Sequence, residues 1–181
     1  MSMPGMSVFA PASCIELKQM IAAAVQLNGP AVILYPRSEG EYIAAEDAFV
    51  PGRWHTMQKG KDAALITFSS MAETALRASK LLKKQGVELM IVNATTLWPL
   101  DEEMLRSLSG VPFYTLEESV LSGGFGSHVA QVCQKMHIPG PRQQMGIPDT
   151  FVPFGDRKEL LCRLGLDADG IARTILEDLK R

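Results

Sequence analysis

The chain has 181 residues, 46% of them hydrophobic, which is enough to bury the core of one ordinary domain and too apolar for a disordered chain. Its 18 basic and 20 acidic residues are scattered and give a formal charge of −2, so no basic patch indicates a nucleic-acid partner. No run of 18 apolar residues predicts a membrane span, and the first residues do not form a signal peptide. We therefore expect a cytoplasmic protein.

The first 35 residues predict a small β-α-β unit. Residues 7–10 form a brief strand, Ser13 and Glu16 make a capping box at the start of a helix, and Gly29 ends that helix. The continuously apolar run Ala31–Tyr35 is typical of a parallel strand. Two strands and one helix cannot bury both faces of a sheet.

The stretch from Pro36 to Pro51 carries several acidic residues and little periodicity, and we interpret 38–51 as a linker. From Trp54 onward, strands alternate with helices. The strands are expected at Trp54–Gln58, Ala63–Phe68, Glu88–Asn93, 111–116 and near Gln143–Gly146, and the helices after Ser70, after Pro99, and over 124–136, 156–164 and 167–179. Ser70 and Glu73 make a second capping box.

The first two of these strands are predicted to form a hairpin around the turn 59–62. The alternation that follows predicts an α/β fold, with a mostly parallel sheet flanked by helices and one antiparallel strand contributed by the hairpin.

Residues 115–128 join a strand end, two glutamates and a glycine-rich turn that opens a helix. Free N–H groups at such a helix start could hold an anion. The residues of this possible anion-binding turn are Gly123, Gly124, Gly126, Ser127 and His128. The alternative is that the glycines only let the helix pack closely on the sheet. A dinucleotide-binding fingerprint is disfavoured, because Val129 occupies the place of its third glycine.

The adjacent residues Glu117 and Glu118 should point to opposite sides of their strand, which disfavours a general acid/base pair. We expect a structural role for them, capping backbone groups or pairing with a neighbouring subunit. Arg37 follows Tyr35 and Pro36 just past the carboxyl end of a predicted parallel strand, where open α/β sheets place their ligands. It could grip a phosphate or carboxylate, or make a simple surface salt bridge.

Six motifs occur in an order typical of one family. They are Pro4–Ala12, Tyr35–Arg37, Pro99–Glu102, Glu117–Ser127, Gly146–Asp149 and Leu164–Ile171. On these motifs the chain resembles the C-terminal part of the 1-deoxy-D-xylulose-5-phosphate synthase family, which are transketolase-like enzymes that use thiamine diphosphate. The resemblance runs from about Pro4 to the end.

The resemblance implies that residues 1–37 are the last β-α-β unit of a pyrimidine-binding domain. It also implies that residues 52–181 form a transketolase-like C-terminal domain, with a five-stranded mixed sheet that helps to form a homodimer. In the complete enzyme, thiamine diphosphate and Mg²⁺ support the decarboxylation of pyruvate and its condensation with glyceraldehyde 3-phosphate. Arg37 matches the arginine that holds the phosphate of this small acceptor substrate.

The sequence departs from the family in the parts that carry the chemistry. The Gly-Asp-Gly motif that holds Mg²⁺ and diphosphate is missing, since Gly155-Asp156 is followed by Arg157, and Trp98 replaces a basic residue. We expect no catalytic residue, no metal site and no cofactor bound by this chain alone. It is then a structural, dimerising portion of a synthase whose other domains are its partners. The alternatives are a subunit of a split transketolase-like enzyme and a non-catalytic dimerisation or anion-binding module.

Overall fold

The computed structural model describes residues 3–36 and 48–180. The N-terminal unit consists of β1 (Ser7–Phe9), α1 (Cys14–Gln26) and β2 (Ala31–Ile33). The rest of the chain forms β3 (His55–Gln58), β4 (Ala63–Thr67), α2 (Met71–Lys84), β5 (Leu89–Asn93), β6 (Thr96–Trp98), α3 (Glu102–Ser107), β7 (Phe113–Val120), α4 (Phe125–Met136), β8 (Gln143–Ile147), α5 (Arg157–Arg163) and α6 (Ala168–Leu179).

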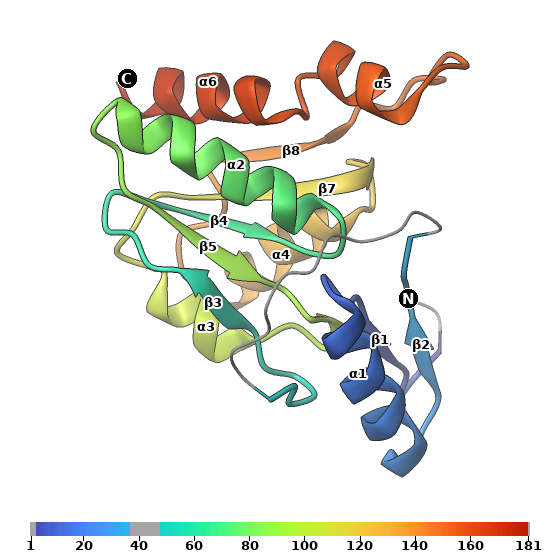
Figure 1. Ribbon diagram of the computed structural model, residues 1–181. Helices are drawn as coiled ribbons and strands as arrows, with labels where there is room; N and C mark the ends of the chain where they lie inside the picture. The colour runs from blue at the N-terminus through green and yellow to red at the C-terminus, as the bar shows by residue number, and fades with distance from the viewer. Residues whose placement is uncertain (1–2, 37–47, 181) are drawn as a thin grey trace.

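The main sheet has five strands in the order β3-β5-β4-β7-β8. Strand β3 runs antiparallel to β5, and the other neighbours are parallel. Helices α2 and α6 cover one face and α3 and α4 the other (Figure 1). The central strand β4 is buried along its whole length, as a continuously apolar parallel strand should be. The predicted fold class is therefore confirmed, with five strands, one antiparallel strand and helices on both faces.

The predicted hairpin between β3 and β4 is wrong, because β5 lies between these two strands and pairs with both. The connection from β3 to β4 instead passes the start of β5. The backbone N–H groups of Lys61 and Asp62 both donate to the Glu88 carbonyl, and the Asp62 carboxylate accepts from the Glu88 N–H at 2.7 Å. A glycine is needed here, since a Cβ on Gly60 would lie 2.2 Å from the backbone nitrogen of Met90.

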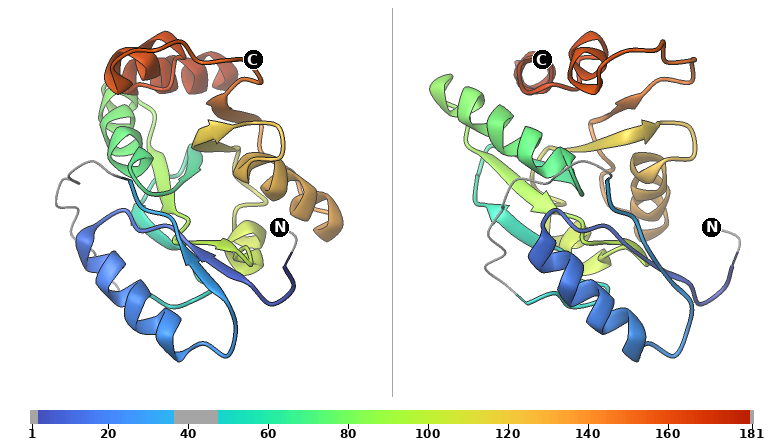
Figure 2. Two further views of the ribbon diagram at one scale, coloured as in Figure 1. Left: turned by 90° about the vertical axis from the view of Figure 1, so that its right-hand side faces the viewer. Right: turned by 45° about the vertical axis from the view of Figure 1, so that its right-hand side comes forward.

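A second, three-stranded sheet has the order β2-β1-β6. Strand β1 is parallel to β2, as the β-α-β pattern predicts, and antiparallel to β6. The sequence did not predict β6, which lies far along the chain yet completes the sheet of the N-terminal unit. Figure 2 shows this unit below the main body, on the side away from α5 and α6.

A buried carboxylate ties the N-terminal unit to the main sheet. Glu16, only 3% exposed, accepts a hydrogen bond from the backbone N–H of Ala12 at 2.7 Å and from the side-chain amide of Asn93 at 2.9 Å. Its second neighbour across the junction is the His55 ring, with Nε2 at 3.2 Å from the carboxylate. Since Asn93 ends β5 and His55 begins β3, α1 is fixed to one edge of the main sheet.

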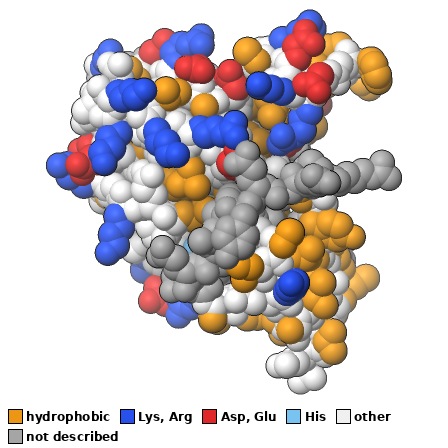
Figure 3. All heavy atoms as spheres, in the orientation of Figure 1, with side chains coloured by type: hydrophobic (Ala, Val, Ile, Leu, Met, Phe, Trp, Pro, Cys, Tyr) orange, Lys and Arg blue, Asp and Glu red, His pale blue; other side chains and the backbone are white. Residues whose placement is uncertain are grey.

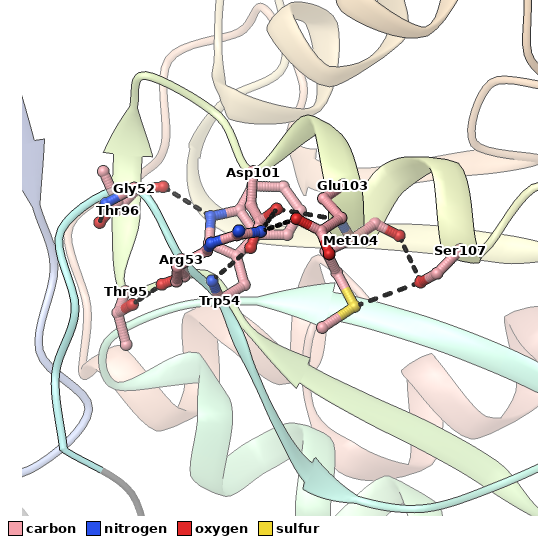
Figure 4. Close-up of polar contacts among 9 residues, drawn as sticks. All are labelled: Gly52, Arg53, Trp54, Thr95, Thr96, Asp101, Glu103, Met104 and Ser107. Atoms are coloured by element: carbon pink, nitrogen blue, oxygen red, sulfur yellow. Dashed lines mark hydrogen bonds and ion pairs between the residues drawn. The ribbon is translucent and has the colours of Figure 1, made fainter.

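The entry into the main domain is built around Trp54 (Figure 4). The carboxylate of Asp101 accepts hydrogen bonds from the backbone N–H of Trp54 at 2.8 Å and from that of Met104 at 2.9 Å. The Trp54 indole donates to the Thr96 carbonyl at 2.7 Å. Asp101 therefore caps α3 and anchors Trp54, the residue directly before β3, which gives the Pro-Leu-Asp-Glu motif a structural role.

Candidate functional site

The glycine-rich turn receives an anion from the chain itself. Strand β7 carries Glu117, which is fully buried, and its carboxylate accepts the backbone N–H groups of Phe125 and Gly126, each at 2.8 Å. It also accepts the hydroxyl of Ser119 in a short hydrogen bond. Two of the free donors in the first turn of α4 are therefore satisfied, and a negative charge lies at the positive end of the helix dipole. The predicted role of the glutamates in capping backbone groups is confirmed for Glu117.

Close packing explains two of the glycines. A Cβ on Gly124 would lie 2.5 Å from the Glu117 carboxylate oxygen, and one on Gly126 would lie 2.5 Å from the hydroxyl oxygen of Thr115. Real Cβ atoms do not approach heavy atoms so closely, so both positions exclude a side chain unless the strand moves away. These glycines bring α4 onto the end of β7, as the second interpretation of the turn expected.

The other residues of the turn face a cleft. The hydroxyl of Ser127 donates to the Leu121 carbonyl at 2.5 Å. The His128 ring stacks on Trp98, with ring centroids 4.5 Å apart and an interplanar angle of 34°. Burial lowers the pKa of His128 below its ordinary value of 6.5, so the ring is neutral at pH 7. His128 therefore offers a hydrogen-bonding ring to this cleft, and no cationic charge.

This cleft, which we call the junction cleft, has a volume of about 1140 Å³ and separates the N-terminal unit from the glycine-rich turn. Its walls come from the carboxyl ends of parallel strands: Tyr35 and Pro36 after β2, Ser69 and Ser70 after β4, and Glu118 in β7. Gly123, Gly124, Ser127 and His128 also line it. An adjoining cleft of about 790 Å³ shares its Tyr35–Pro36 and Ser69–Ser70 walls. Open α/β sheets place ligands at such a position.

The cation in the described part of the junction cleft is Arg157, at the start of α5. Its Nε donates to the Glu118 carboxylate at 2.7 Å, and an Nη donates to the hydroxyl of Ser70 at 3.1 Å. The hydrogen bond to Glu118 raises the pKa of Arg157, so this guanidinium stays charged. The second predicted capping box is wrong, because Ser70 makes no cap bond and its hydroxyl takes part in this cluster instead.

Sequence reasoning missed Arg157 as a site residue. Its partner Glu118 is 39 positions away and Ser70 is 87 positions away, so no local spacing links them. The available signal was the capping aspartate Asp156, which fixes the start of α5 beside the strand ends. Arg37, the predicted phosphate-binding residue, lies outside the described residues, although its neighbours Tyr35 and Pro36 line both clefts.

Over residues 3–36 and 48–180 there is no group of three or more His, Cys, Asp or Glu side chains that could hold a metal ion. Within the same ranges, no helix is long and apolar enough to cross a membrane.

Comparison with known proteins gives the family. Residues 52–171 match the family described as "Transketolase, C-terminal domain". The chain is similar to 1-deoxy-D-xylulose-5-phosphate synthase from Halalkalibacterium halodurans, with 37% identity over 99% of this chain and 30% of that protein. The synthase from Magnetococcus marinus is 36% identical over 97% of this chain and 29% of that protein. The chain thus spans about 30% of the length of these curated relatives.

Solved structures agree. A split-gene transketolase described as an inactive beta4 tetramer has a TM-score of 0.84 and 29% identity, covering 99% of this chain and 59% of that one. A mutant transketolase from Pichia stipitis, with a TM-score of 0.74 and 18% identity over 99% of this chain and 26% of that one, shares the fold. The chain therefore belongs to the transketolase C-terminal domain family.

Proposed function

We propose that this chain is the C-terminal portion of a 1-deoxy-D-xylulose-5-phosphate synthase-like enzyme, and that it has a structural and dimerising role. The observation that carries the proposal is the similarity to such synthases over 99% of the chain. The complete enzyme would use thiamine diphosphate and Mg²⁺ to condense pyruvate with glyceraldehyde 3-phosphate. In this proposal the chain supplies a wall of the substrate cleft, and the reaction centre belongs to other domains.

The proposed domain division places the end of a pyrimidine-binding domain at 1–37, a linker at 38–51 and the C-terminal domain at 52–181. Two observations support it. The family match begins at residue 52, and β1, α1 and β2 form a parallel unit with only three residues in each strand. Such short strands with one helix need further elements to cover both faces.

Arg37 is the residue proposed to bind the phosphate of the acceptor substrate. Its neighbours Tyr35 and Pro36 line the junction cleft, and the cation opposite, Arg157, already has a carboxylate partner in Glu118. Gly123, Ser127 and His128 line the same cleft, and we assign them to its wall. An anion held at the helix start itself would compete with Glu117 for the N–H groups of Phe125 and Gly126.

The described residues do not fit the cofactor. Mg²⁺ is held by oxygen ligands, with carboxylates prominent among them, and no carboxylate-rich cluster that could hold a metal is present over 3–36 and 48–180. We therefore assign thiamine diphosphate and Mg²⁺ to other domains, and no chemical step is assigned to this chain.

Calorimetry and sedimentation test the proposal. Titration of the isolated chain with thiamine diphosphate in the presence of Mg²⁺ is expected to give no binding heat, and sedimentation is expected to show a dimer. A chimera in which this chain replaces the matching part of the H. halodurans synthase is expected to condense pyruvate with glyceraldehyde 3-phosphate. Tight cofactor binding by the isolated chain, or a folded but inactive chimera, would contradict the proposal.

One observation favours a second candidate, in which the chain acts as a separate subunit of a split transketolase-like enzyme. The solved structure with a TM-score of 0.84 is a split-gene transketolase whose described assembly is inactive. In this case the chain would become active only with a second polypeptide. Purification from its native cells separates the two candidates, since a subunit would be recovered at 19.8 kDa together with another chain.

A further inference from the structure

The loop between β8 and α5 holds two phenylalanine rings away from the rest of the chain. Phe151 and Phe154 have relative exposures of 105% and 106%, so their rings are as accessible as in an isolated peptide. The loop extends from the main body beside α5 (Figure 1), and hydrophobic side chains gather at the outer tip there (Figure 3). Single exposed apolar residues are ordinary, whereas two fully exposed aromatic rings within four residues leave a larger apolar surface uncovered.

This loop is stiff. Pro148 precedes both rings and Pro153 lies between them, and each proline fixes its own φ angle. The Thr150 N–H donates to the Pro148 carbonyl at 2.7 Å. At the other end, Asp156 caps α5 by accepting the Lys158 N–H at 2.9 Å. We call residues 148–156 the arm. A loop whose conformations are already restricted loses less conformational entropy when its rings are buried by a partner, which favours binding.

The arm ends next to a residue that lines the junction cleft, and this cleft also contains uncovered apolar residues. Arg157, which directly follows the arm, lines the cleft, and so do Leu34 and Tyr35, which are 48% and 65% exposed. Val120, at the end of β7, is 42% exposed. A partner that covers the cleft therefore meets both the arm and the residues that follow β2.

We propose that Phe151 and Phe154 are the anchors that dock this chain onto the catalytic part of a synthase-like enzyme. The inference rests on the proposed function. The occupant is the larger part of the synthase length, since this chain spans only about 30% of its curated relatives. That part would present an apolar pocket to the two rings and would close over the junction cleft.

The charges of the arm favour this occupant over a second copy. Between residues 148 and 156 the charged side chains are Asp149 and Asp156. A two-fold contact built on the arm would bring the carboxylates of both arms into one interface, which like-charge repulsion opposes. A different body can meet them with neutral or basic groups.

The test compares one pair of substitutions in two settings. The double variant Phe151→Ser/Phe154→Ser is made both in the isolated chain and in the chimera with the H. halodurans synthase. Because both phenylalanines are fully exposed, the unfolding midpoint of the isolated chain should not fall. The midpoint of the chimera should fall, because the two rings lose their apolar contacts with the rest of the enzyme. Val50→Ser is the matched control, since Val50 is 53% exposed and lies outside both clefts, and it should leave both midpoints unchanged.

The outcomes separate this inference from the proposed function. A native chimera that does not fold or is inactive would overturn both. An active chimera whose midpoint is the same with and without the two phenylalanines would overturn only the docking inference. Loss of self-association of the isolated chain in sedimentation, with no change in the chimera, would assign the arm to a second copy and would also overturn it.

Discussion

At the scale of single residues, Glu117 determines the character of the glycine-rich turn. Its carboxylate is fully buried and satisfies two backbone N–H groups and a hydroxyl. Glu117→Gln should destabilise the fold by about 1–3 kcal/mol, because the amide turns a donor toward N–H groups that need an acceptor. Urea unfolding measures the change. Glu118→Gln is the control, since its partially exposed ion pair with Arg157 is worth about 0–1 kcal/mol. Equal losses for the two variants would contradict this account.

The same pair of residues shows what a sequence can predict at this scale. Glu117 acts on groups eight and nine positions ahead, so strand alternation and a helix start were enough to expect a capping role. Arg157 could not be found this way, because its partners come from two other strand ends and meet it only in the folded chain.

At the scale of elements, the connection between β3 and β4 depends on Gly60. A Cβ there would lie within 3 Å of the backbone of Glu88, Leu89 and Met90, so Gly60→Ala should cost about 1–3 kcal/mol through overpacking. Gly140→Ala is the matched control, because a Cβ at Gly140 has no heavy atom within 4 Å. Thermal unfolding of the two variants compares them, and a Gly60 variant as stable as the Gly140 variant would refute this steric role.

The hairpin prediction failed at this element for a physical reason. Two short strands joined by four residues with a glycine normally pair, and local sequence favours that pairing. Here β5, which comes much later in the chain, supplies hydrogen bonds to both strands and separates them. The composition of β3 is the same whether it pairs with β4 or with β5, so only the tertiary arrangement decides between these two pairings.

At the scale of the whole molecule, Glu16 joins the N-terminal unit to the main sheet. Glu16→Gln should loosen this junction, because an amide matches the Asn93 amide and the Ala12 N–H less well than a carboxylate does. Hydrogen exchange of the Ala10 amide, which donates to the Thr95 carbonyl, should accelerate by roughly tenfold. Glu103→Gln, at a 76% exposed side chain, should have no such effect. Unchanged exchange at Ala10 in the Glu16 variant would show that other contacts hold the unit.

The sequence predicted the fold class of the main domain but left the position of residues 1–37 open. Long segments whose apolar residues repeat with the helical period can be recognised as helices from the sequence, as the buried faces of α2 and α6 show. Strand β6 has only three residues and no alternation that distinguishes it from a loop. The sequence therefore could not predict the pairing of β6 with β1, which positions the N-terminal unit.

Strand β6 has a consequence for how the molecule can be divided. The family boundary at residue 52 separates the chain in sequence, yet β6 lies beyond that boundary and pairs with β1, which lies before it. The side-chain amide of Asn93 also donates to the Glu16 carboxylate across the same boundary, at 2.9 Å. A protease that nicked the backbone near residue 52 would leave two pieces still associated. A shortened chain that began at residue 52 would lack β1, the strand with which β6 pairs.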